Sequence, residues 1–190
     1  MKIGLYFGTF NPIHIGHLAI ANIMANDTDL EKVWFMVSPQ NPFKVNQTLA
    51  HEHDRFEMVR LSIFENDNLE ASDFEFSLPK PSYTVDTLAR LREKHPQHEF
   101  SLIIGGDNLS HFHKWKNYED ILKHHELLVY PRNNSKPTEL ENNSKVKMVK
   151  SPLLDISATY IRNAIKDNRS YKYLIPEEAV EYIKSKSLYI

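Results

Sequence analysis

Two histidines, His14 and His17, lie three residues apart in a turn near the start of the chain, within the sequence GTFNPIHIGH. The apolar run 3–7 precedes this turn, and the stretch 18–25, which favours a helix, follows it. This order is typical of the first strand, loop and helix of an α/β domain, where ligands bind at the junction. A helix N-terminus offers unpaired N–H groups and the positive end of the helix dipole. The two imidazoles there indicate a site for a polyphosphate.

A second candidate anion site lies in the stretch 156–162, far along the chain. Ser157 is predicted to cap a helix whose inner face carries Ile161 and Ile165. The hydroxyls of Ser157 and Thr159, the amides of the helix start and the guanidinium of Arg162 could together hold the distal end of a polyphosphate.

Two further polar side chains follow predicted buried strands. Lys44 lies in a proline-containing loop after the strand 33–37, where it could reach a phosphate, although a solvated loop lysine is the alternative. Asp107 follows the strand 100–104 and the glycine pair Gly105-Gly106. Glycines let the backbone approach a ligand closely, and a carboxylate at this position would lie near a ribose or a metal.

Hydroxyl and aromatic side chains in the middle of the chain have two interpretations each. Tyr83 and Thr84 begin a predicted helix, so they could cap it or contact a ligand. The aromatic residues of 109–118 recur at roughly helical spacing, which is more typical of a core than of a stacking surface. Trp115, between Lys114 and Lys116, is the candidate exception.

The remaining elements indicate one α/β domain of 190 residues with buried parallel strands. Further strands are predicted at 127–130 and 146–149, and helices at 51–64, 82–91 and 121–125, with a closing helix that begins at Pro176. The segment 132–145 is rich in Asn, Ser, Lys and Glu, and we expect a mobile loop without chemistry there.

Composition excludes several classes of function. The chain has 41% hydrophobic and 25% charged residues and a net charge of −2, which gives no general field for attracting nucleic acid or an anionic membrane. It has no cysteine, so disulfides and thiolate ligands are absent, as is compatible with the cytoplasm. No stretch approaches membrane-spanning length, and the apolar start is too short for a signal peptide. A homo-oligomer is left open.

The motifs resemble those of the bacterial nicotinate-nucleotide adenylyltransferases, within the nucleotidyltransferase superfamily. Residues 8–17 resemble the motif GxFxPxHxGH, and residues 156–162, ISATYIR, resemble ISSTxIR. The segments 42–44, 81–88 and 105–109, with Phe112 and Trp115, are similar to the family's substrate-recognition segments. The chain departs from the pattern at Asn11, where many members have Asp, and at Ala158, which replaces a serine.

This resemblance implies a Rossmann-like fold, with a doubly wound, mostly parallel sheet, helices on both faces and a small C-terminal helical part at about 156–190. It implies adenylyl transfer from ATP, accompanied by Mg²⁺, to nicotinate mononucleotide, with no metal ligands expected from protein side chains. The implied catalytic residues are His14, His17, Lys44 and Arg162. The implied ATP contacts are Gly8, Thr9, Phe10, His14, His17, Gly105, Asp107, Ile156, Ser157, Thr159 and Arg162. The implied contacts with the acceptor are Phe10, Asn11, Lys44, Tyr83, Thr84 and Trp115.

The resemblance also suggests individual roles. His17 would lie nearest the α-phosphate, Lys44 and Arg162 would hold the outer phosphates beside Mg²⁺, and Asp107 would contact the adenylate ribose. Trp115 would stack on nicotinate, while Thr84 and the amides near Tyr83 would receive its carboxylate.

Several alternatives compete with this interpretation. The strings HIGH at 14–17 and KMVKS at 147–151 are similar to the signatures of class I aminoacyl-tRNA synthetases, but the chain is too short for their additional modules. Nearer rivals are transfer to nicotinamide mononucleotide or phosphopantetheine, and transfer of a cytidylyl group. A nucleotide-binding module without catalysis is the alternative from another class.

Overall fold

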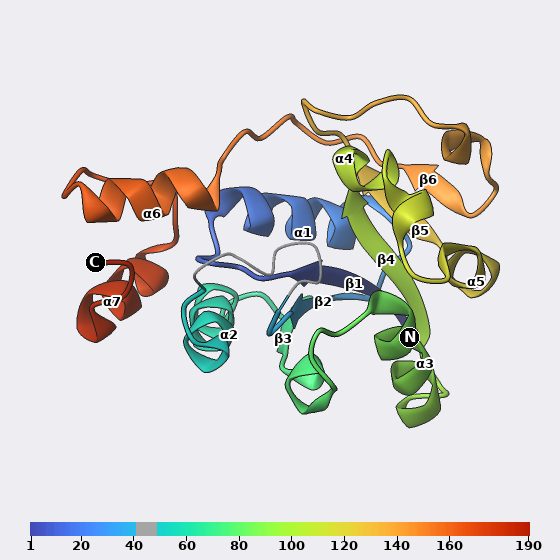
Figure 1. Ribbon diagram of the computed structural model, residues 1–190, viewed down its shortest axis with the longest axis horizontal. Helices are drawn as coiled ribbons and strands as arrows, with labels where there is room; N and C mark the ends of the chain where they lie inside the picture. The colour runs from blue at the N-terminus through green and yellow to red at the C-terminus, as the bar shows by residue number, and fades with distance from the viewer. Residues whose placement is uncertain (41–48) are drawn as a thin grey trace.

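The computed structural model of the protein describes residues 1–40 and 49–190, which form an α/β fold around a parallel sheet (Figure 1). The sheet has the order β3-β2-β1-β4-β5-β6, and every neighbouring pair is parallel. The order reverses between β1 and β4, which is the point where open α/β sheets bind ligands. The strands are β1 (Lys2–Gly8), β2 (Lys32–Val37), β3 (Leu69–Ser72), β4 (Glu99–Gly105), β5 (Leu127–Tyr130) and β6 (Val146–Met148).

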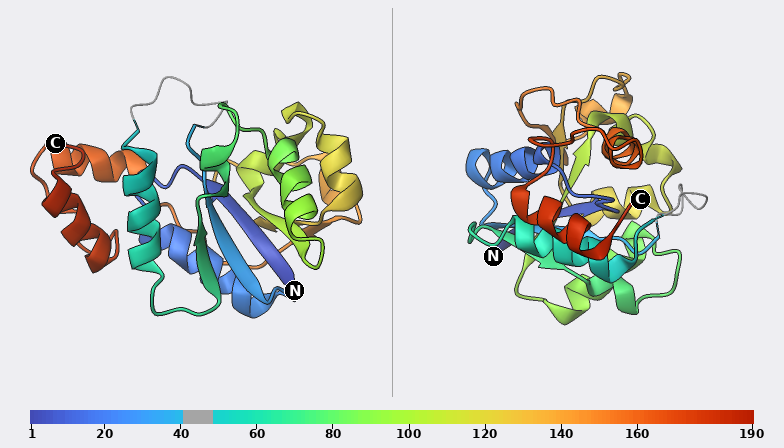
Figure 2. Two further views of the ribbon diagram at one scale, coloured as in Figure 1. Left: turned by 90° about the horizontal axis from the view of Figure 1, so that it is seen from below. Right: turned by 90° about the vertical axis from the view of Figure 1, so that its left-hand side faces the viewer.

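Helices connect the strands and extend the fold at its C-terminal end. They are α1 (Ile15–Asp27), α2 (Glu52–Ser62), α3 (Thr84–Lys94), α4 (Gly106–Leu109), α5 (Tyr118–His124), α6 (Ala158–Lys166) and α7 (Glu177–Lys186). Short 3₁₀ turns occur at η1 (Phe74–Ser77), η2 (Phe112–Lys114) and η3 (Glu139–Asn142). Helices α6 and α7, orange and red in Figure 2, lie beside α2 at one end of the molecule.

Both faces of the sheet are buried, and successive residues of β1 show how. Ile3 and Leu5 face a core shared with α3 and α5, whereas Tyr6 faces a second core shared with α1 and α2. Residues of α6 and α7, including Ile161 and Ile183, are buried in this second core. Because neither face of the central strands meets water, these strands read as continuous apolar runs, and this is why the sequence located them.

The structure departs from the sequence prediction in two places. Strand β3 was not predicted. It lies at the edge of the sheet and has only four residues, two apolar and two polar, so it lacks an apolar run. The aromatic stretch 109–118 is divided between the end of α4, the turn η2 and the start of α5. Phe112 in this stretch is fully buried, as expected of a core residue.

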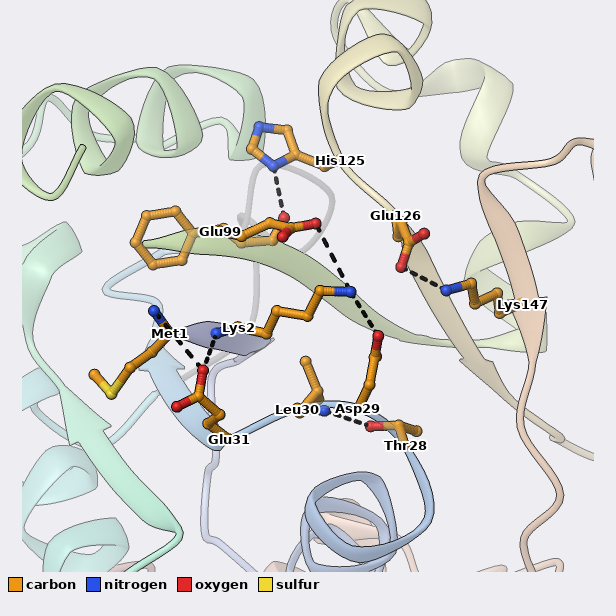
Figure 3. Close-up of polar contacts among 11 residues, drawn as sticks. Met1, Lys2, Thr28, Asp29, Leu30, Glu31, Glu99, His125, Glu126 and Lys147 are labelled. Carbon is orange, nitrogen blue, oxygen red and sulfur yellow. Dashed lines mark hydrogen bonds and ion pairs between the residues drawn. The ribbon is translucent and has the colours of Figure 1, made fainter. Parts of the chain in front are cut away.

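Charged side chains gather at the amino ends of the strands, opposite the predicted site (Figure 3). Lys2 Nζ lies 2.5 Å from Asp29 Oδ2 and 4.0 Å from Glu99 Oε1, and Lys147 Nζ lies 2.8 Å from Glu126 Oε2. Exposed ion pairs of this kind contribute little to stability. Lys147 belongs to the KMVKS string, which therefore starts within strand β6 and is explained by the sheet.

Within residues 1–40 and 49–190, no helix is both long enough and apolar enough to cross a bilayer.

Candidate active site

A cavity of about 390 Å³ opens at the carboxyl ends of β1, β4 and β5, next to the switch point of the sheet. It brings together most of the predicted ATP contacts from distant parts of the chain. The predicted residues that line it are Gly8, Thr9, Phe10, Asn11, His14, His17, Asp107, Ile156, Ser157, Thr159 and Arg162. The two candidate anion sites, which are more than 130 residues apart in sequence, therefore form the walls of one cavity.

The two imidazoles form a stacked pair at the start of α1. Their ring centroids are 3.6 Å apart and their planes differ by 20°. The backbone N–H of His14 donates to Nδ1 of His17 at 3.2 Å. Since Nδ1 accepts this hydrogen bond, the neutral ring of His17 carries its proton on Nε2, which makes that nitrogen a donor.

Gly16 lies between the two histidines in the sequence, at a position where a side chain would crowd the ring of His14. A Cβ atom on Gly16 would lie 3.1 Å from Nδ1 and 3.2 Å from Cε1 of His14, and 3.7 Å from Cβ of Ile156. A larger residue at position 16 would thus make close contacts with the His14 ring. The glycine of the motif is explained by this close approach.

His14 is neutral at physiological pH because of its surroundings. It is only 6% exposed, and its burial, together with the positive charge of Arg132, lowers its pKa to about 4. A neutral imidazole can donate to a phosphate without the cost of burying a charge in the empty cavity.

Residues 8–11, from the end of β1 into the loop before α1, pack closely against the ring of His17. Phe10 has φ 44°, an uncommon conformation for an aromatic residue, and its buried ring packs 5.0 Å from the ring of His17. A Cβ atom on Gly8 would lie 2.8 Å from the Phe10 ring. The lack of a side chain at Gly8 therefore leaves room for the Phe10 ring, and the Phe10 ring packs against the ring of His17.

Helix α6 is fastened to this loop by Arg162. Its Nη1 donates to the carbonyl oxygen of Asn11 at 2.7 Å and its Nη2 donates to Oγ1 of Thr159 at 3.1 Å. The side chain of Asn11 in turn accepts from the backbone N–H of Ala50 at 3.1 Å. Ser157 caps α6 as predicted, accepting from the backbone N–H of Tyr160 at 3.3 Å.

Arg132 also lines the cavity, although the sequence predicted no chemistry for the segment 132–145. Arg132 follows β5 directly after Pro131, so it projects from the same edge of the sheet as the predicted residues. Among the described residues its guanidinium makes one hydrogen bond, from Nη1 to the carbonyl oxygen of Leu154 at 3.3 Å. Its position after a buried strand was the signal that could have revealed it.

Asp107 lines the cavity from the first turn of α4, whereas Gly105 before it does not line it. A Cβ atom on Gly105 would clash with the carboxylate of Asp107 and lie 3.0 Å from Cγ of Arg132. Gly105 thus makes room for these two side chains. The hydroxyls of Tyr6 and Tyr130, 3.3 Å apart, contribute another polar wall that was not predicted.

Of the predicted acceptor contacts, Phe10 and Asn11 line the cavity, whereas Tyr83, Thr84 and Trp115 form a separate group. Tyr83 precedes α3 and Thr84 is its first residue, and Tyr83 makes no side-chain capping bond. Trp115 packs 4.9 Å from the ring of Phe112, and Lys116 Nζ lies 4.7 Å from the centre of the Tyr83 ring. The start of α3 and the segment around Trp115 are therefore adjacent, but these residues do not line the described cavity. Lys44 lies outside the described residues.

In the part of the chain that the structure describes, no group of three or more His, Cys, Asp or Glu side chains could hold a metal ion. The side chains of the cavity supply hydrogen-bond donors and guanidinium groups instead, which suits an anionic ligand.

Comparison with known proteins identifies the family. A family model described as cytidylyltransferase-like matches residues 5–164. A probable nicotinate-nucleotide adenylyltransferase from Cytophaga hutchinsonii is 58% identical over 189 residues, which cover 100% of this chain and 98% of the relative. A protein of the same description from Flavobacterium johnsoniae is 49% identical, with 100% and 99% covered. The chain belongs to the nicotinate-nucleotide adenylyltransferase family.

A solved structure shows that the adenylyltransferase fold is shared over the whole chain. Plasmodium falciparum nicotinic acid mononucleotide adenylyltransferase complexed with NaAD matches with a TM-score of 0.84 at 22% identity, covering 99% of this chain and 97% of that one. The predicted Rossmann-like fold with a parallel sheet is thereby confirmed.

The depressed pKa of His14 predicts an acid-sensitive fold for this adenylyltransferase. The unfolded chain binds a proton on His14 near pH 6.5, and the folded chain only near pH 4. Stability from this group is therefore present above pH 6.5 and is lost as pH falls toward 4, by about 2 kcal/mol at pH 4.5. Urea unfolding of the wild type and of His14→Asn at pH 7 and 4.5 measures this difference. An equal loss of stability in both proteins would contradict it.

Proposed function

We propose that the chain transfers the adenylyl group of ATP to the phosphate of nicotinate mononucleotide, forming nicotinate adenine dinucleotide and pyrophosphate in NAD biosynthesis. The observation that carries the proposal is the stacked His14–His17 pair at the N-terminus of α1, which faces the hydroxyls of α6 across one cavity. This geometry suits a triphosphate that runs from the start of α1 to the start of α6.

The reaction needs no nucleophile from the protein. An oxygen of the acceptor phosphate, already ionised near neutral pH, forms a bond to the α-phosphorus as the bond to the pyrophosphate oxygen breaks. Catalysis then comes from alignment of the two substrates and from stabilisation of the charge that develops. Nε2–H of His17 is assigned to the α-phosphate. Neutral His14 stacks on the His17 ring and donates a hydrogen bond to the phosphate chain beside it.

The pyrophosphate end of ATP is assigned to Arg132 together with Ser157, Thr159 and the first amides of α6. Arg162 already donates to Asn11 and Thr159, so its main role is to position the loop and the helix rather than to hold the outer phosphates. Lys44 remains a candidate for the same charge. Mg²⁺ enters with ATP as part of the substrate, bound by phosphate oxygens.

Nucleoside and acceptor recognition follow from the other strand ends. Asp107 is assigned to the adenylate ribose and Ile156 to the ATP side of the cavity. Trp115 is assigned to stacking on nicotinate, and the start of α3, with Tyr83 and Thr84, to its carboxylate. Helix N-terminal amides favour an anionic carboxylate over a neutral amide, which supports nicotinate over nicotinamide as the acceptor.

The activity is tested by pyrophosphate release from ATP and Mg²⁺ with each acceptor in turn, in the wild type and in His17→Ala. We expect release with nicotinate mononucleotide and a much smaller rate with nicotinamide mononucleotide or phosphopantetheine. His17→Ala should lower kcat roughly a hundredfold or more, because one donor to the developing charge is lost. His124→Ala is the control, since His124 is exposed in α5 and does not line the cavity.

Two results would contradict this assignment. One is release of pyrophosphate without any of these acceptors, and the other is wild-type turnover in His17→Ala.

A second prediction concerns Arg132. Arg132→Ala should raise KM for ATP roughly tenfold and weaken product inhibition by pyrophosphate, because a charge-assisted donor to the phosphates is removed. The matched control is Arg169→Ala, which removes an exposed arginine paired with Asp167 at 3.0 Å. Unchanged ATP and pyrophosphate constants in Arg132→Ala would exclude this role.

A further inference from the structure

Arg55 is the largest of the fully buried side chains, at 1% exposure, and lies in α2 outside the described cavity. A buried guanidinium is usually paired with a carboxylate. Within residues 1–40 and 49–190, all its hydrogen bonds go instead to backbone carbonyl oxygens. Burying the guanidinium of Arg55 is costly, and no carboxylate is hydrogen-bonded to it. Packing alone therefore does not explain why an arginine occupies this position.

The four carbonyl groups that Arg55 binds come from three places in the chain. Nη1 donates to Thr9 at 2.6 Å and to Ser38 at 2.7 Å, Nη2 donates to Pro39 at 3.0 Å, and Nε donates to Ala50 at 2.9 Å. One planar group therefore joins the loop after β1 to the segment after β2 and to the residues just before α2.

These contacts lie where the sheet stops. The parallel pairing of β1 with β2 ends at Gly8 and Val37, followed by one bond from the Ser38 N–H to the Gly8 carbonyl at 2.8 Å. Residues 9–11, which follow β1, line the cavity, whereas Ser38 and Pro39, which follow β2, do not. Just past the last hydrogen bond between β1 and β2, the guanidinium of Arg55 binds the carbonyl groups of Thr9 and Ser38. The spacing between the two strand ends is therefore set by this guanidinium.

The end of β2 is joined in turn to the start of α3. The buried carboxyl of Glu75 accepts from Oγ1 of Thr87 at 2.7 Å, and the hydroxyls of Ser38 and Ser82 lie beside it. Thr87 lies in the first turn of α3, next to the residues assigned to the acceptor. Arg55 thus joins Thr9 to Ser38 at the end of β2, and η1, which packs against β2, is joined to α3 through Glu75 and Thr87.

We infer that Arg55 is a positioning residue for adenylyl transfer, which fixes the ATP-binding loop relative to the acceptor-binding side of the site. The inference rests on the proposed function. Each half-site is built by its own residues, and Arg55 sets the distance between them. Lysine cannot replace it, because one ammonium group has neither the span nor the planar fork that reaches all four carbonyl groups.

The test is the variant Arg55→Lys, with Arg60→Lys as the matched control on the same helix. Arg60 is exposed and pairs with Glu57 at 2.6 Å. Kd values for ATP alone and for nicotinate mononucleotide alone, from calorimetry, are compared with kcat, and folding is checked by circular dichroism. We expect kcat to fall about tenfold to a hundredfold in Arg55→Lys while each Kd changes less than threefold, because misalignment acts on the reaction itself. Arg60→Lys should match the wild type in all three quantities.

Three results would overturn the inference: an unchanged kcat, a loss of kcat matched by an equal loss in one substrate's affinity, or an Arg55→Lys protein that does not fold. The last would give Arg55 a purely structural role. Failure of the proposed function is distinguishable from all three, since the wild type itself would then release no pyrophosphate with nicotinate mononucleotide.

Discussion

The site depends on one constraint, the fixing of the short loop 9–11 by guanidinium groups from two helices. Arg55 of α2 binds the carbonyl oxygen of Thr9, and Arg162 of α6 binds that of Asn11. This loop leaves β1 and leads directly into His14 and α1, so its position sets where the stacked imidazoles face. The N-terminus of α1, the N-terminus of α6 and the cavity between them follow from these contacts. The fold brings the parts together, and the two arginines set their spacing.

The electrostatics of the cavity suit an anion that arrives and leaves. His14 is kept neutral by burial and by Arg132, so its buried ring adds no positive charge that would have to be desolvated. The positive character comes from helix N-termini and from Arg132 and Arg162, whose guanidinium groups bind backbone carbonyls. Because such groups are fixed before the substrate binds, they need little rearrangement when charge moves from the α-phosphate to the pyrophosphate.

The sequence predicted the fold well because the central strands are buried on both faces and appear as apolar runs, as at 33–37 and 100–104. The cap at Ser157 and the helix start at Pro176 were found because these signals are local in the sequence. Strand β3 was missed because an edge strand of four half-polar residues has no such pattern.

The site was predicted less completely than the fold, since a long side chain is directed by tertiary contacts. Nothing in the local pattern shows that Arg162 turns to Asn11 or that Arg55 is buried, whereas Arg132 could have been inferred from its position after a buried strand. The motifs located the two walls of the cavity, and the structure showed which arginines bind backbone carbonyls and which of them line the cavity.

The central claim is that the acceptor phosphate attacks the α-phosphorus of ATP directly, aligned by the protein and without a covalent enzyme intermediate. The most direct test is the stereochemical course at that phosphorus. It is measured with ATP made chiral at the α-phosphorus, either by replacing one oxygen with sulfur or by labelling the oxygens with different isotopes. A single in-line displacement predicts inversion of configuration in the nicotinate adenine dinucleotide formed. Retention would require two displacements, and hence a nucleophile on the protein, and would contradict the account.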